Sequence, residues 1–219
     1  AGSAYVVFGS GTAPASVDLD QVAQGSGGFE IIGESTSDSI GASVSSAGDV
    51  NGDGVDDLIV GATRNGADGV SGIYPVAAYV VFGSAIPTSQ INLDAVALGT
   101  GGFKIISEVS NNFVGASVSS AGDVNGDGVD DLIVGASLAS SAYVVFGSRT
   151  PPALVDLAAV AQGSGGFKII SEYSQDSLGI SVSSAGDVND DGFDDLFVGA
   201  PDNDAGGDGS GAAYVVFGG

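Results

Sequence analysis

Three short stretches of the chain place oxygen-bearing side chains at alternate positions ahead of a glycine. In the first, Asp49, Asn51, Asp53 and Asp57 occupy positions 1, 3, 5 and 9 of a loop whose position 6 is Gly54. A hard cation such as Ca²⁺ takes about six to eight oxygen ligands, and side chains at alternate positions of a curled loop point inward. Position 7 can add its main-chain carbonyl, because the glycine permits the sharp turn. The predicted ligands are Asp49, Asn51, Asp53, Val55 and Asp57, then Asp123, Asn125, Asp127, Val129 and Asp131, then Asp187, Asn189, Asp191, Phe193 and Asp195.

The same residues admit a simpler interpretation, because Asn-Gly-Asp-Gly is also a strong hairpin-turn signal. All three copies nevertheless keep an acid or an amide at the same four positions, and Gly52 becomes Asp190 only where no ligand is required. A turn alone would not need the acid at position 9. The pattern therefore predicts about three Ca²⁺ ions, one per loop. The loops are not EF-hands, because position 12 is valine in each of them.

The charge balance of the chain narrows the classes of partner. The 219 residues carry a formal net charge of -23 with only 4 Lys and Arg, so nucleic acid and anionic membranes are poor partners. The lack of Cys and His excludes disulfides, thiolate metal sites and imidazole bases. A hydrophobic content of 43% predicts a folded chain, and no apolar run is long enough for a membrane span.

Location and completeness of the chain are inferred from the metal and from the missing methionine. Calcium loops of this kind need concentrations well above those of the resting cytosol, so we expect an extracellular or cell-surface, secreted protein. The chain contains no Met and starts inside a repeat. Both features indicate a processed chain or a piece of a longer one.

One sequence unit recurs along the whole chain. Ala-Tyr-Val-Val-Phe-Gly begins at Ala4, Ala78, Ala142 and Ala213, and its Phe precedes the first loop acid by 41 residues in every repeat. Length varies only in the connection after each loop, at 63–77, 137–141 and 201–212, as variable surface loops do. We therefore divide residues 1–219 into repeats 4–77, 78–141 and 142–212, with a closing strand at 213–219.

The sequence of each repeat predicts four short strands and one helical turn. Tyr5–Phe8 and Phe29–Ile32 are rich in β-branched and aromatic residues, and Asp57–Gly61 follows the loop. A narrow strand of small residues precedes the loop at 41–45, 115–119 and 179–183, which suits a place where several sheets converge. The helical turn is expected to start at Asp18, Asn92 and Asp156 and to stop at Gly25, Gly99 and Gly163.

These elements predict an all-β fold built from propeller blades. Four short strands in each unit of 64 to 74 residues make one antiparallel sheet that is too small to fold alone. Radial stacking of such sheets gives a β-propeller. A β-sandwich also has short strands at regular spacing, but it would not explain long, nearly identical repeats.

Residues around the second loop carry a family resemblance. Phe113-Val114-Gly115-Ala116-Ser117-Val118, with Val134-Gly135-Ala136, resembles the FG-GAP repeat of integrin α-subunit propellers. The Tyr-Val-Val-Phe-Gly strand is similar to that of bacterial FG-GAP proteins. The resemblance covers nearly the whole chain, and it implies blades with Ca²⁺ in the loop between their first two strands. Ile40-Gly41 and Leu178-Gly179 depart from Phe-Gly.

The chain holds three blades' worth of strands, and three blades cannot ring a channel, since propellers typically need about four or more. The opening strands 5–8 and 29–32 lack the two strands that precede them in a repeat, and the last sheet lacks its Phe-Ile-Ile strand. The two ends would be complementary halves of one blade. Either copies of the chain join end to end in a ring or filament, or the missing blades belong to a longer polypeptide.

We expect a calcium-stabilised structural or adhesive module on a bacterial surface or in its matrix, and not an enzyme. Without His or Cys, acid–base catalysis would depend on carboxylates, Tyr or one of the four Lys and Arg side chains. Asp202, Asp204 and Asp208 form an irregular acidic cluster where a glycosidase pair is conceivable, but a solvated Gly-rich loop is the simpler interpretation. A platform of variable loops that binds a protein or a polysaccharide is the remaining alternative.

Overall fold

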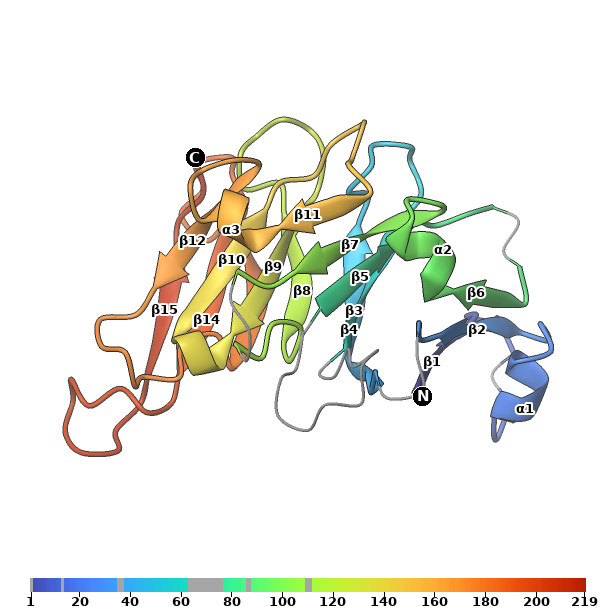
Figure 1. Cartoon of the computed structure of the whole chain (residues 1–219), viewed down its shortest axis with the longest axis horizontal. Helices are drawn as coiled ribbons and strands as arrows, with labels where there is room; N and C mark the ends of the chain where they lie inside the picture. Colours follow the sequence, from blue (N-terminus) through green and yellow to red (C-terminus); the bar gives the residue numbers. More distant parts are fainter. Residues whose placement is uncertain (1, 13, 35–37, 63–76, 86–87, 109–111) are drawn as a thin grey trace.

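The computed structural model describes residues 2–12, 14–34, 38–62, 77–85, 88–108 and 112–219. In this part of the chain four β-sheets stand side by side in chain order, from the blue N-terminal end to the red C-terminal end of Figure 1. Helices are limited to single short turns between strands. The predicted all-β class is therefore confirmed. No helix among the described residues is long and apolar enough to cross a membrane.

The two central sheets each contain the four antiparallel strands predicted for a blade. In both, the Tyr-Val-Val strand pairs with the strand after the loop on one side and with the Phe-Lys-Ile-Ile strand on the other. Their register sets Tyr79 opposite Lys104 and Tyr143 opposite Lys168. The first blade consists of β3 (Ile40–Gly48), β4 (Asp57–Ala62), β5 (Ala77–Val81) and β7 (Gly102–Ile106), and the second of β8 (Val118–Gly122), β9 (Asp131–Ala136), β10 (Ser141–Val145) and β12 (Gly166–Ile170).

The two outer sheets are incomplete. The N-terminal sheet pairs β1 (Ser3–Val7) with β2 (Gly28–Ile32), which are the third and fourth strands of a blade. The C-terminal sheet orders β13 (Ser181–Gly186), β14 (Asp195–Ala200) and β15 (Ala212–Val216), which are the first three. Because the Tyr-Val-Val strand is present at both ends, the ends overlap by one strand and are not two separate halves of a blade. That part of the prediction was wrong.

Short helical turns follow the Tyr-Val-Val strands as predicted. Each begins at an Asp or Asn whose side chain accepts the N–H two residues on, at 2.9–3.0 Å. Each is followed by a glycine with positive φ, +87° at Gly25 and +85° at Gly99 and Gly163. The turns are α1 (Leu19–Val22), α2 (Leu93–Ala97) and α3 (Leu157–Val160), and a 3₁₀ turn, η1 (Ser137–Ala139), lies in the second variable connection.

The structure departs from the prediction in two local features. First, β6 (Gln90–Asn92) and β11 (Leu154–Asp156) add as parallel strands to β2 and β7 of the preceding sheet, so pairing is not entirely antiparallel. Second, the narrow strands predicted at 115–119 and 179–183 start only at Val118 and Ser181. The residues before Val118 form a turn in which the Ala116 N–H donates to the Phe113 carbonyl at 3.1 Å. Most of the connection 63–77 lies outside the described residues.

The hydrophobic core lies between successive sheets and not inside any one of them. Three clusters fill the three gaps between neighbouring sheets. Both central blades are therefore covered on both faces, which is why β5, β9 and β10 are buried at every position. After the first residue of β9 and of β10, these strands accordingly show no alternation of apolar and polar residues.

Glycines allow the inner edges of the blades to approach closely, as the narrow strands of small residues predicted. The innermost strand β8 contacts both β3 and β13. A Cβ on Gly61 would lie 1.8 Å from the Gly115 carbonyl oxygen, and one on Gly135 would lie 1.9 Å from that of Gly179. Gly115 and Gly179 adopt φ of +83° and +87°, so they can turn their carbonyls toward the preceding blade.

Candidate functional site

Each predicted cation loop joins the first two strands of a blade. In the β3–β4 loop, Asp49 Oδ2 accepts the N–H of Gly54 at 2.8 Å, and Asn51 Oδ1 accepts that of Asp53 at 2.8 Å. Asp53 Oδ1 accepts the N–H of Val55 at 2.9 Å. The same bonds recur in the β8–β9 and β13–β14 loops at 2.9–3.0 Å. In all three loops, the side chains at positions 1, 3 and 5 therefore turn toward the inside of one tight turn.

The backbone conformation at position 4 of the loop explains why the third copy has Asp where the other two have Gly. Gly52 and Gly126 adopt φ of +69° and +72°, and Asp190 adopts +61° at the same place. Asp is among the few residues other than Gly that tolerate this left-handed conformation. Asp190 therefore keeps the turn and adds an exposed carboxylate.

The acid at position 9 is buried and bound to the main chain. Asp57, Asp131 and Asp195 are 0% exposed. The two oxygens of Asp57 accept the N–H groups of Val50 at 3.1 Å and Gly83 at 2.8 Å, so this side chain fastens the loop to the end of the Tyr-Val-Val strand. Burial raises the pKa of Asp57 to about 6 and that of Asp131 to about 7, against the opposing effect of these hydrogen bonds. The sequence indicated a ligand here but not this structural role.

The donor set of each loop fits a hard cation. It contains only carboxylate, amide and main-chain oxygens, and a carboxylate oxygen that accepts one N–H keeps a further lone pair. No three acidic side chains in the described part of the chain gather closely enough to hold a metal ion by themselves. The predicted ligand set of the first loop also includes the Asn51 amide and the Val55 carbonyl, and it stays a prediction.

The acid at position 8 connects the loops of successive blades. The Asp49 N–H donates to Asp130 Oδ2 at 2.8 Å, and the Asp130 N–H donates to the Asp49 carbonyl at 3.2 Å. Asp123 and Asp194 repeat both bonds at 2.9 and 3.2 Å. Sequence reasoning missed this role. The signal that could have revealed it is the Asp-Asp pair at positions 8 and 9 of every copy.

Comparison with known families agrees with this arrangement. The family model described as FG-GAP repeat matches residues 41–74, 114–147 and 178–216. Every match includes an inner strand, the loop with its acids and the strand after the loop. This chain is an FG-GAP repeat protein. Its sheets are β-propeller blades of the integrin-alpha-like type, and the unclosed row of sheets fits an incomplete ring.

Curated relatives of this FG-GAP protein include two integrin alpha chains. It is 29% identical to Integrin alpha ina-1 of Caenorhabditis elegans over 161 residues, which cover 70% of this chain and 14% of the relative. It is 30% identical to Integrin alpha-PS5 of Drosophila melanogaster over 172 residues, which cover 73% of this chain and 15% of the relative. The chain thus spans about one seventh of the length of these relatives.

A second contact between blades joins Glu, Lys and Tyr. Glu108, four residues after Lys104, accepts the Lys168 ammonium of the next blade at 2.6 Å and also the Tyr143 hydroxyl. The Lys168 Nζ lies 5.2 Å from the centre of the Tyr143 ring. These hydrogen bonds, that from Lys168 first, lower the pKa of the Glu108 carboxyl. Glu34, Lys104 and Tyr79 repeat the arrangement one blade earlier.

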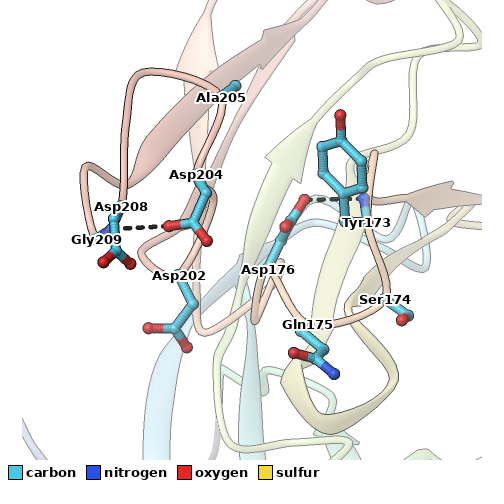
Figure 2. Close-up of a pocket in the computed structure, with 9 residues that line it drawn as sticks. All are labelled: Tyr173, Ser174, Gln175, Asp176, Asp202, Asp204, Ala205, Asp208 and Gly209. Atoms are coloured by element: carbon cyan, nitrogen blue, oxygen red, sulfur yellow. Dashed lines mark hydrogen bonds between the residues drawn. The ribbon is translucent and has the colours of Figure 1, made fainter.

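The acidic cluster of the third variable connection borders an open pocket of about 800 Å³ (Figure 2). Asp202 Oδ2 accepts the Ser177 hydroxyl at 2.6 Å, and Asp204 Oδ1 accepts the Gly209 N–H at 2.7 Å. Asp176, which also lines the pocket, is 2% exposed and accepts the Asn203 side-chain amide at 2.9 Å. Hydrogen bonds within the loops therefore account for the positions of three of the four acidic side chains that line the pocket. The fourth, Asp208, has no hydrogen-bond partner among the described residues.

Proposed function

We propose that this protein is a calcium-stabilised structural and adhesive β-propeller module that works outside the cell. The observation that carries the proposal is the repeated loop, in which one hydrogen-bonded turn directs the side chains at positions 1, 3 and 5 inward in all three copies. The integrin-alpha-like character of the blades supports the adhesive part of the proposal. Its ligand would be a protein or a polysaccharide that contacts the variable loops.

The role of the metal would be mechanical. Each loop carries proposed carboxylate ligands at positions 1, 5 and 9. A divalent cation would offset the repulsion between these side chains when they are ionised. Burial is the main cause of the raised pKa of Asp57 and Asp131, and the other carboxylates of the same loop raise it further by a smaller amount. Since binding would require the folded loop, it would stabilise the blade by about 2.7 kcal/mol per site at a hundredfold excess of Ca²⁺ over its Kd.

The incomplete outer sheets support the further proposal that additional strands complete the propeller. These strands would come from further copies of the chain or from further blades of a longer polypeptide. The face of the C-terminal sheet that points away from its neighbour leaves Phe197 and Val215 47% and 45% exposed. The equivalent residues of the preceding blade, Ile133 and Val144, are fully buried by the sheet that follows them.

Two variants in the third loop test the calcium assignment. Asp191→Ala removes a proposed ligand, whereas Asp190→Gly removes a carboxylate of the same loop at a position that is not a ligand. We expect Asp191→Ala to bind about two Ca²⁺ ions in place of about three and to melt at a lower temperature in calcium. Asp190→Gly should keep all of them, because it restores the residue of the other two loops. Equal stoichiometry in both variants would disprove the assignment.

A further inference from the structure

The outer edge of β15 lacks the partner that every other Tyr-Val-Val strand has. In the other three sheets, the Phe at the end of this strand donates its N–H to a glycine carbonyl that precedes the fourth strand, at 2.8–2.9 Å. No described residue accepts the N–H of the corresponding Phe217. The backbone of β15 is therefore ready to pair with one more antiparallel strand.

The ring of Phe217 also lacks a partner. In each of the other sheets this Phe lies 5.9–6.0 Å, centre to centre, from the Phe of the fourth strand. These pairs are Phe8 with Phe29, Phe82 with Phe103 and Phe146 with Phe167. Phe217 is 61% exposed instead. A strand that added to β15 would need an aromatic residue to repeat this pair.

The third contact that the last sheet lacks is an ion pair. In the two central blades, a lysine of the fourth strand bridges the tyrosine beside it and a glutamate of the preceding blade. Tyr214 and Glu172 stand at the corresponding places in the last sheet, and the Asn203 amide lies between them at 3.2 and 3.5 Å. Among the described residues, no Lys or Arg pairs with Glu172.

We propose that the strand which completes this sheet carries a lysine opposite Tyr214 and a phenylalanine opposite Val215. The register follows from the complete blades, where Tyr143 faces Lys168 and Val144 faces Phe167. Its sequence would resemble Gly-Phe-Lys-Ile-Ile. The inference rests on the proposed need for additional strands, and it does not depend on calcium.

The same contacts argue against the strand β2 of an identical second copy. β2 has the required Phe29, but Glu30 stands where the lysine belongs and accepts the Tyr5 hydroxyl at 3.2 Å. Added to β15, it would bring Glu30 toward Glu172. Two like charges at a partly buried position repel, whereas the lysine at this place forms an ion pair in both complete blades.

The chain itself supplies a matched pair of test strands. Residues 24–34 and 162–172 differ only at Glu30 versus Lys168 and at Gly33 versus Ser171. A copy of residues 149–172 joined after Gly219 would continue the repeat in its natural order. A second version would carry Lys168→Glu within the copied segment alone. Thermal melting in saturating calcium would compare the two versions with the 219-residue chain.

The version with the copied lysine should have a higher melting temperature than the original chain. It should also melt roughly 3 °C or more above the version with glutamate, which is the shift that the loss of one ion pair predicts for a protein of this size. Glu172→Lys in the original repeat should reverse the order of the two versions. If the two versions melt together, or if neither differs from the original chain, the proposal is wrong. Calcium stoichiometry, measured separately on the original chain, would show whether the calcium proposal fails independently.

Discussion

Asp130 Oδ2 accepts the main-chain N–H of Asp49 at 2.8 Å, across the boundary between two blades. The reverse bond, from the Asp130 N–H to the Asp49 carbonyl, makes the contact reciprocal. Because Asp49 is also position 1 of a proposed calcium loop, the geometry of one loop depends on a residue of the next. The pair Asp123 and Asp194 extends this connection to the third loop.

Asp130→Ala should therefore weaken calcium binding in the loop of the preceding blade. The variant removes a charged acceptor from the Asp49 N–H, a loss of about 1.5 kcal/mol or roughly tenfold in affinity. Asp56→Ala is the matched control, because Asp56 occupies the same loop position but its side chain accepts no N–H among the described residues. Calorimetric titration of both variants measures the effect. Equal losses would mean that Asp130 acts only through its charge.

Gly135→Ala should be among the most damaging substitutions in the chain. The new Cβ would lie 1.9 Å from the Gly179 carbonyl oxygen, so two blades would have to separate, at a cost of about 3 kcal/mol or more. Gly199 stands at the same position of the last blade, where a Cβ meets only the Ser181 side chain within 3 Å. Denaturant unfolding should therefore show a much smaller loss for Gly199→Ala. Similar losses would contradict the close packing of blades at this edge.

Glu108→Gln should destabilise the protein in a pH-dependent manner. The Lys168 and Tyr143 hydrogen bonds lower the pKa of Glu108 from 4.5, so its ionised form stabilises the fold. That stabilisation is present above pH 4.5 and is lost as the pH falls through the lowered pKa. The gap in unfolding free energy between the two proteins, about 1 kcal/mol at neutral pH for a partly exposed pair, should close in acid.

Glu172→Gln is the control for this measurement, since Glu172 has the same place in its repeat but no lysine partner among the described residues. Its stability difference from the unsubstituted protein should be smaller and should change less with pH. A constant gap for Glu108→Gln between neutral pH and pH 3 would contradict the ion-pair explanation.

The repeated sequence was sufficient to predict the blades, because every strand and loop occurs several times at fixed spacing. The contact of Asp130 with Asp49 was not predictable in the same way. Periodicity within a repeat identifies the acid but not which neighbouring blade it faces. Gln90–Asn92 was too short to show the alternation of a strand, and its parallel pairing with the outer edge of β2 joins residues of two different repeats. β8 starts late because the residues before it form a turn, in which the Ala116 N–H donates to the Phe113 carbonyl, and the small-residue pattern did not reveal this turn.

Calorimetric titration of the calcium-free protein with Ca²⁺, together with melting with and without chelator, tests the central claim most directly. Binding of about three ions, with a melting temperature that falls in chelator, would agree with one ion in each of the three loops. A titration without binding heat, and melting that chelator does not alter, would contradict it. The acidic loops would then be hairpin turns that their own side chains hold closed.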